Sequence, residues 1–300
     1  MSAYIEVNSN AAPFAVAGED ISVTLVDTIV GLDGSASSDP DGDAISFSWS
    51  FDSAPPGSTA TLTNANTATP NFKVDAYGEY VVRLTVTDSK GASAEDTVTV
   101  SFINLPPLAD AGGNDSGVVA NAVTLDGSDS SDPNNDPITF SWAIASAPDG
   151  SSAALVSSNT ATPSFTPDVP GTYVIELTVS DGLLTDTDES SIEVISLQNA
   201  TAGALAGTVT AIKVMSDASI KNKQMKKALT NKINAVLKNL EDGDYASALE
   251  KLQDDILSKT DGCANGGSPD KNDWIRVCAD QDKVYPIVVS AIDYLKLLLP

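Results

Sequence analysis

The chain contains no histidine, and only 16 of its 300 residues are lysine or arginine. The missing histidine excludes a histidine general base, a histidine-containing zinc site and a Ser-His-Asp triad. A catalytic site would need a carboxylate pair or a Lys-Ser dyad, and no carboxylate pair is set apart in an apolar surround. The chain also lacks the roughly 20 consecutive apolar residues that span a bilayer. We therefore expect neither catalysis nor membrane insertion.

Basic residues are scarce where acidic residues are dense. Residues 1–200 hold 28 Asp and Glu against 3 basic residues, whereas residues 201–300 hold 13 of each. The net charge of −25 therefore lies on the first two thirds of the chain. This charge disfavours nucleic acid and anionic membranes as partners. Clustered carboxylates favour a divalent cation as their counter-charge.

Cysteine is also rare, since the chain has only Cys263 and Cys278. An even count at moderate spacing favours a disulfide over a metal site, the alternative being two unpaired thiols. A disulfide would place the protein in an oxidising compartment. Residues 1–7 show neither the basic region nor the apolar run of a signal peptide, which predicts a mature, already trimmed chain.

The chain repeats itself with a register of 93 residues. The segment Leu32–Trp49 returns at Leu125–Trp142 with 13 of 18 positions identical. A period near 90 residues indicates two tandem domains rather than a solenoid. We assign the first domain to residues 1–103 and the second to residues 104–196.

Both copies show the two-residue period of half-buried strands. Apolar and polar residues alternate along Ile45–Phe51 and along Ile138–Ile144. Short strands of this kind, separated by Asp-Gly and Pro-Gly turns, predict a β-sandwich in each copy. The alternation directs Trp49 and Trp142 inward, which favours core packing over a platform for a sugar ring.

The last hundred residues have a different pattern. Residues 197–217 are small and weakly patterned, which predicts a connector with at most one ordered piece. Residues 218–300 carry apolar positions at helical spacing and predict a disulfide-containing helical bundle. Lysines concentrate here, and we weigh a solvated helix face against a polyanion site and against docking onto the acidic repeats. These lysines are Lys213, Lys221, Lys223, Lys226, Lys227, Lys232 and Lys238.

Two motifs carry a family resemblance. The sequence S-S-D-P-D-G-D precedes a strand ending in Trp, and G-x-Y-x-V-x-L-T-V-T-D follows it. This pair resembles the PKD domains, a family of immunoglobulin-like modules of extracellular proteins. The resemblance implies two tandem immunoglobulin-like sandwiches. Together with the helical pattern of residues 218–300, it predicts a mainly β protein with a separate C-terminal helical bundle. K-x-L-x-N-K-I-N-A-x-L and D-Y-x-x-A-L-x-K-L make the helical region similar to the FIVAR and FIMAH modules of secreted bacterial or archaeal proteins.

The resemblance also implies calcium sites, because some PKD domains bind calcium through the first two aspartates of the motif. The turn at Asp39–Asp43 suits this role, with Gly42 permitting a tight backbone. The alternative is that these residues only shape turns and strand ends. The implied ligands of the first site are Asn10, the carbonyl of Ala11, Asp39, Asp41 and Asp88. Those of the second are Asn104, the carbonyl of Leu105, Asp132, Asn134 and Asp181, and the uncharged Asn134 predicts weaker binding.

These observations favour a non-catalytic structural or adhesive protein, located extracellularly or at the cell surface. Its calcium-rigidified sandwiches would act as spacers that present the helical module to a cell-surface or matrix component. The partner would be a polysaccharide or a protein, and self-association is a further expectation, because a free strand edge can pair with another chain. The alternative is the accessory substrate-binding region of a secreted hydrolase.

Overall fold

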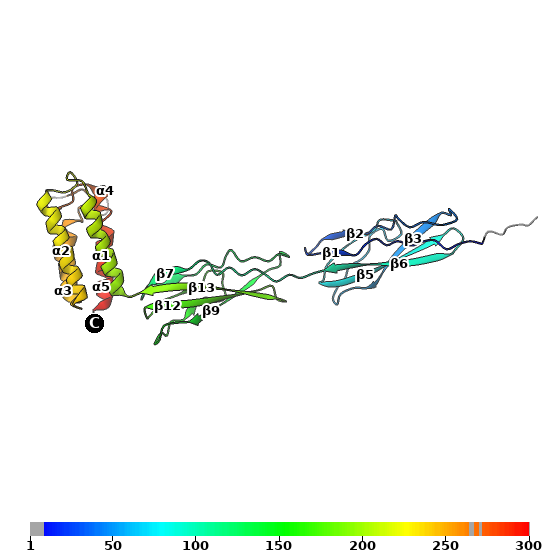
Figure 1. The fold of residues 1–300 in the computed structure, drawn as a ribbon, viewed down its shortest axis with the longest axis horizontal. Helices are drawn as coiled ribbons and strands as arrows, with labels where there is room; N and C mark the ends of the chain where they lie inside the picture. The colour runs from blue at the N-terminus through cyan, green and yellow to red at the C-terminus, as the bar shows by residue number, and fades with distance from the viewer. Residues whose placement is uncertain (1–8, 264–266, 270–271, 300) are drawn as a thin grey trace, which may run out of the picture.

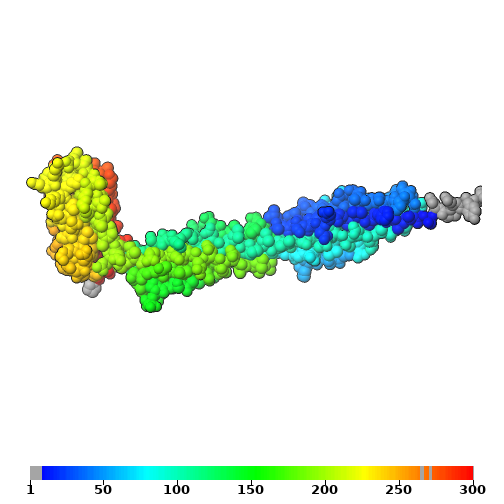
Figure 2. Space-filling view, viewed as in Figure 1, coloured from blue at the N-terminus to red at the C-terminus, as the bar shows by residue number. Residues whose placement is uncertain are grey.

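The computed structural model describes residues 9–263, 267–269 and 272–299, and these form three modules arranged end to end. Two β-sandwiches follow one another along a common axis, and a helical bundle lies across that axis at the C-terminal end (Figure 1). Figure 2 shows the same arrangement as a continuous rod with a transverse head. The mainly β fold with a separate α module is confirmed.

The first sandwich has a four-stranded sheet in the order β1-β6-β5-β3, facing the antiparallel pair β2-β4. The sheet is antiparallel except where β1 pairs parallel with β6. Its strands are β1 (Ile21–Val23), β2 (Ile29–Gly31), β3 (Ile45–Ser53), β4 (Asn71–Lys73), β5 (Gly78–Asp88) and β6 (Ser93–Phe102).

The second sandwich repeats this plan with the sheet β7-β13-β12-β9 and the smaller sheet β10-β11-β8. As in the first sandwich, the strand of the larger sheet that comes first in the chain, β7, pairs parallel with the strand that comes last in the chain, β13. The strands are β7 (Asp115–Val118), β8 (Val123–Thr124), β9 (Thr139–Ser146), β10 (Leu155–Val156), β11 (Ser164–Phe165), β12 (Gly171–Ser180) and β13 (Thr185–Ile195).

Each sandwich is built around its tryptophan. Trp49 and Trp142 are each 4% exposed, and their indole N–H groups donate to the carbonyls of Thr67 and Thr160 at 3.0 Å. A Cβ on Gly34 would lie 2.9 Å from the Trp49 ring, so the tight fit requires glycine there. The prediction that both tryptophans pack in the core is confirmed.

A buried tyrosine fixes one end of each sandwich. The Tyr80 hydroxyl donates to Asp75 Oδ1 at 2.9 Å, and Asp75 also accepts from Ser58 Oγ at 2.6 Å. Tyr173 and Asp168 repeat this contact in the second copy. The aspartate is thereby held by several hydrogen bonds in each sandwich.

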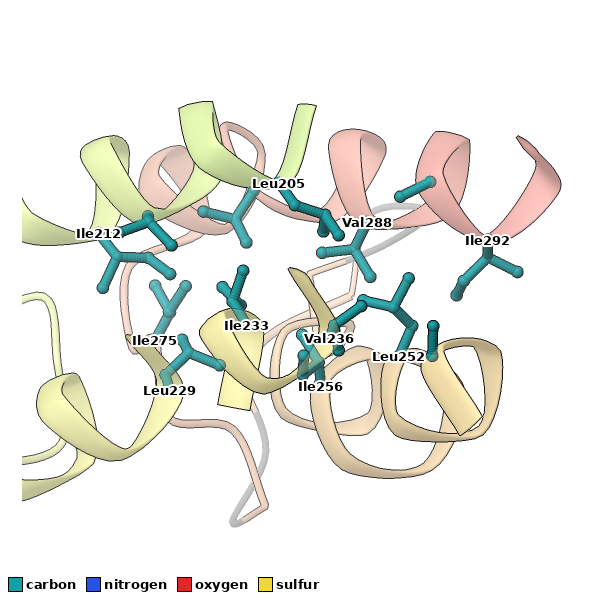
Figure 3. Packing of buried hydrophobic residues seen from close by; sticks show 14 of the residues in the cluster. Leu205, Ile212, Leu229, Ile233, Val236, Leu252, Ile256, Ile275, Val288 and Ile292 are labelled. Carbon is teal, nitrogen blue, oxygen red and sulfur yellow. The ribbon is translucent and has the colours of Figure 1, made fainter. Parts of the chain in front are cut away.

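The helical bundle begins one residue after β13. Its segments are α1 (Leu197–Val214), α2 (Lys223–Glu241), α3 (Tyr245–Glu250), the π-helical segment η1 (Lys251–Ile256), the 3₁₀ turn η2 (Leu257–Lys259), α4 (Cys278–Gln281) and α5 (Tyr285–Leu298). Ser196 caps α1, because its side chain accepts the N–H of Asn199. Leu205 and Ile212 of α1 are fully buried against α2 and α5 (Figure 3). The prediction that residues 197–217 form a connector is therefore wrong.

Cys263 and Cys278 form a disulfide, which confirms the sequence prediction. The bridge ties the loop after η2 to the start of α4. The sequence Ser-Pro-Asp at residues 268–270 is typical of a helix start, but Ser268 and Pro269 are not helical, and Asp270 lies outside the described residues.

Several lysines of the bundle have partners within the bundle. Lys232 pairs with Asp255 at 2.8 Å and Lys238 with Asp242 at 3.0 Å, while the Lys226 ammonium donates to the carbonyl of Met215 at 2.6 Å. Surface pairs of this kind contribute little stability. They do reduce the positive field available to a polyanion. In the described part of the chain, no helix has the length and hydropathy needed to cross a bilayer.

Candidate cation sites at the ends of the sandwiches

A tight acidic turn opens β3 in the first sandwich. Asp39 Oδ1 accepts the backbone N–H groups of Asp41 at 2.8 Å and Asp43 at 3.1 Å. Gly42 adopts a φ of 78°, which a residue with a side chain rarely adopts. One oxygen of Asp39 thus shapes the turn and leaves the other oxygen, Oδ2, available.

The first cluster consists of Asp39, Asp41 and Asp43, whose carboxylate oxygens lie within 4.8 Å of one another. Asp39 Oδ2 is buried and has no hydrogen-bond partner among the residues that the structure describes. A buried charged oxygen without a partner is costly, and a cation would satisfy it. Lys90 supplies positive charge nearby, since its ammonium lies 2.8 Å from Asp43 Oδ2.

The other residues predicted for the first site surround this cluster. Asn10 Nδ2 donates to Asp88 Oδ2 at 2.6 Å, and this bond holds the pKa of Asp88 below its ordinary value. The N–H of Ala11 donates to Asp41 Oδ2 at 2.7 Å. Asp88 is itself 5% exposed. These contacts bring Asn10, Ala11 and Asp88 to the same end of the sandwich as the first cluster. Ala11 makes its contact through the N–H, so the roles of its carbonyl and of Asp88 as cation ligands stay predictions.

The second sandwich forms the equivalent turn. Asp132 Oδ1 accepts the N–H groups of Asn134 at 2.7 Å and Asp136 at 3.0 Å. Asn135 stands where the first copy has Gly42, and its φ is 67°, a conformation that asparagine tolerates better than most residues. The carboxylates of Asp132, Asp136 and Asp181 lie within 4.8 Å of one another.

Within the described part of the chain, two buried oxygens at the second site have no hydrogen-bond partner, namely Asp132 Oδ2 in the cluster and Asn104 Oδ1 beside it. Asn104 Nδ2 donates to Asp181 Oδ2 at 2.8 Å, which fixes the linker residue beside the cluster. The pKa of Asp181 is lowered, chiefly by the backbone N–H of Leu184. The lowered pKa keeps the Asp181 carboxylate in its charged form.

Asn134 is placed differently from the other predicted ligands. Its side-chain oxygen accepts the N–H of Leu105 at 2.6 Å, and its Nδ2 donates to the carbonyls of Ile103, at 2.8 Å, and Thr24. Thr24 and Ile103 belong to the end of the first sandwich. The amide thus lies between the two sandwiches, and its role as a ligand stays a prediction.

Sequence reasoning missed Asp43 and Asp136 as members of the two clusters. The signal was present, because both copies place an aspartate four residues after the first aspartate of the motif. Lys90 contacts the first cluster through Asp43, and Tyr77 contacts the second through Asp136. No sequence pattern marked either contact. Their proximity depends on the folded hairpin and on the joint between the sandwiches.

The chemistry of both clusters fits calcium. The available atoms are carboxylate and amide oxygens, the ligand type that calcium prefers. Each cluster also contains a buried oxygen that no hydrogen bond satisfies. Asp39, Asp41 and Asp43 would hold a cation in the first site, and Asp132, Asp136 and Asp181 in the second. A bound cation would supply electrostatic cross-linking of loops.

The fold and the repeated turns define a tandem immunoglobulin-like module. The family described as K319L-like, PKD domain, matches residues 17–102 and 112–194. The chain belongs to this family of PKD domains.

Relatives with this domain are large proteins. The chain is 33% identical over 173 residues to the mouse dyslexia-associated protein KIAA0319-like protein, covering 56% of this chain and 16% of the relative. It is 33% identical over 204 residues to human dyslexia-associated protein KIAA0319, covering 63% and 18%. It is 30% identical over 103 residues to collagenase ColA of Clostridium perfringens, covering 34% and 8%. The chain thus spans less than a fifth of the length of these relatives.

Among solved structures, the PKD domain from KIAA 1837 protein is 33% identical, with a TM-score of 0.27. The match covers 32% of this chain and 90% of that domain. The description of the matched family names a domain and no reaction.

Proposed function

We propose that this chain is a non-catalytic extracellular module with a structural or adhesive role, in which calcium-bound sandwiches form a spacer that presents the helical bundle. The end-to-end arrangement of the modules supports the spacer. Membership of the PKD family supports a location outside the cell or at its surface. The disulfide supports the same location, because disulfides persist in oxidising compartments.

One observation carries the calcium part of the proposal. Asp39 Oδ2 and Asp132 Oδ2 occupy equivalent places in the two copies, and both are buried without a hydrogen-bond partner in residues 9–263, 267–269 and 272–299. A single buried oxygen without a partner would be a local irregularity. Because the equivalent aspartate oxygen is unpartnered in both copies, we treat it as a property of the fold. Calcium bound there would connect the turn before β3 or β9 to the segment that begins the same sandwich, which contains Asn10 in the first copy and Asn104 in the second.

Thermal unfolding in excess calcium and in chelator tests this proposal. A ligand that binds only the folded state at 100 times its dissociation constant adds about 2.7 kcal/mol, which raises a small domain's Tm by several degrees. We expect Asp39→Ala and Asp132→Ala each to remove part of that rise. Asp149→Ala, which deletes an exposed carboxylate away from both clusters, is the matched control. Equal melting with calcium and with chelator would overturn the calcium sites.

A second candidate function is the accessory substrate-binding region of a secreted hydrolase. The similarity to collagenase ColA favours it. Its partner would be an insoluble protein or polysaccharide. Co-sedimentation of the chain with collagen, chitin and cellulose tests this function, with a collagen-specific interaction as the expected outcome. Recovery of all the protein in the supernatant would leave the spacer role as the better account.

A further inference from the structure

The joint between the two sandwiches is made of more than a linker. Phe102 ends β6, and two prolines follow at Pro106 and Pro107, which restrict the backbone of the connection. Loops from both sandwiches also meet across the joint. These contacts involve Asn134 and Asp136 on one side and Thr24 and Tyr77 on the other.

We propose that Asn134 and Tyr77 form a lock, made of protein atoms alone, that fixes the orientation of the second sandwich on the first. The lock goes beyond the proposed calcium sites and holds without a bound cation. Its two halves come from opposite sides of the joint.

Asn134 is the central element of this lock. The residue is fully buried (0% exposed) although it lies in a turn. Its amide N–H groups donate to the carbonyl of Thr24, just after β1, and to the carbonyl of Ile103, just after β6. Its oxygen accepts the N–H of Leu105. One amide thus joins two strand ends of the first sandwich to the turn of the second.

The repeat shows why the residue is asparagine. The equivalent residue of the first copy is Asp41, which accepts the N–H of Ala11 in the same way that Asn134 accepts that of Leu105. A carboxylate has the shape of the amide but no hydrogen to donate. The substitution in the second copy therefore adds the two donors that the carbonyls of Thr24 and Ile103 require.

Tyr77 supplies the other half. Its hydroxyl donates to Asp136 Oδ2, and its ring packs on Phe102 with 4.3 Å between the ring centroids. The second copy has Pro170 at the equivalent position. The second sandwich is followed by the helical bundle and not by another sandwich (Figure 1).

The two copies therefore differ at the positions that face the joint. Tyr77 departs from the repeat at the end of the first sandwich, and Asn134 departs from it at the start of the second. Each departure introduces the hydrogen-bond donor that the other side of the joint uses. Two matched departures on opposite sides favour a specific interface over an accidental contact.

Residual dipolar couplings of the full chain in chelator test the lock. Locked sandwiches share one alignment tensor, whereas independent sandwiches give two tensors of different magnitude. We expect one tensor for the wild type. Asn134→Asp should give two tensors and a broader distribution of end-to-end distances in small-angle scattering, because a carboxylate would face two carbonyls.

Two further variants make the test specific. Asp41→Asn makes the reverse exchange at the outer end of the first sandwich and should keep one tensor. Tyr77→Phe removes one hydroxyl and should loosen the joint partially, which decides the matter if Asn134→Asp prevents folding. Two tensors in the wild type, or one tensor in both Asn134→Asp and Tyr77→Phe, would overturn the proposal. Calcium-dependent melting is a separate measurement, so failure of the lock and failure of the calcium sites can be told apart.

Discussion

Lys90 and Leu183 stand at equivalent positions in the hairpins that follow Asp88 and Asp181. The Lys90 ammonium pairs with Asp43 in the first cluster, and this contact raises the pKa of Lys90. Leu183 is 68% exposed and brings no charge to the second cluster. The first cluster therefore has an internal counter-ion that competes with a bound cation. The uncharged Asn134 predicts weaker binding at the second site, but a comparison of the two sites must also include the effect of Lys90 on the first.

If calcium binds as proposed, Lys90→Leu should strengthen binding at the first site. Removing a positive charge adjacent to the ligands should lower the dissociation constant by about tenfold. Isothermal titration in the Asp132→Ala background isolates the first site. Lys73→Leu is the matched control, because Lys73 pairs with Asp27 elsewhere on the same sandwich. An unchanged dissociation constant in Lys90→Leu would contradict the internal counter-ion.

Asp75 and Asp168 should contribute to a loss of stability at low pH. Hydrogen bonds hold the pKa of each far below its ordinary value, the strongest from Ser58 and Ser151 respectively. The stabilisation is complete above the unfolded-state pKa of about 3.9 and is lost as the pH falls toward the folded-state pKa.

Thermal melts between about pH 6 and pH 2 measure this contribution. The double variant Asp75→Asn/Asp168→Asn should start with lower stability and decline less steeply with acid than the wild type. Parallel curves for the two proteins would show that these aspartates do not couple folding to pH.

At the scale of elements, α1 shows what a hydrophobic pattern fails to reveal. Thr201 and Thr208 are fully buried on α1, and their hydroxyls donate to the carbonyls of Leu197 and Ala204. Buried threonines satisfied in this way interrupt the apolar period without interrupting the helix. The segment therefore looked unpatterned, although Leu205 and Ile212 occupy the core.

Leu205→Ala tests whether α1 is integral to the bundle. The side chain is 0% exposed, and a cavity at such a site costs about 2–5 kcal/mol. Calorimetry should show a lower transition temperature for the bundle and unchanged transitions for the sandwiches. Leu297→Ala on α5, where the leucine is 57% exposed, should have little effect. Equal effects from the two substitutions would mean that α1 does not pack in the core.

The strands and most members of the clusters were predictable because their determinants are local. Alternation sets β3 and β9, and the acidic turns are contiguous in sequence. The joint was not predictable in the same way. Asn134 meets the carbonyl of Thr24, which is 110 residues away in the sequence, and only the folded chain brings the two together.

At the scale of the whole molecule, three modules are joined by very short connections. Only Ser196 separates β13 from α1, so the direction of the bundle follows from the end of the sandwich. Asn121 Nδ2 also donates to the hydroxyl of Tyr294 at 3.2 Å, across the boundary. A cleft of about 420 Å³ lies beside this contact, between Ile195 and α5. The head of the rod is thus oriented by covalent geometry and by a side-chain contact.

The parallel pairing of β1 with β6, and of β7 with β13, has a mechanical consequence. A pull on the two ends of a sandwich draws the first and last strands of its larger sheet, which are parallel neighbours, in opposite directions along their length. The hydrogen bonds between them are then loaded in shear, all together, instead of being opened one after another. In single-molecule stretching, both sandwiches should yield at higher force than the helical bundle, and yielding at or below the bundle's force would contradict this geometry. Under tension, the bundle would extend first while the two sandwiches kept their length.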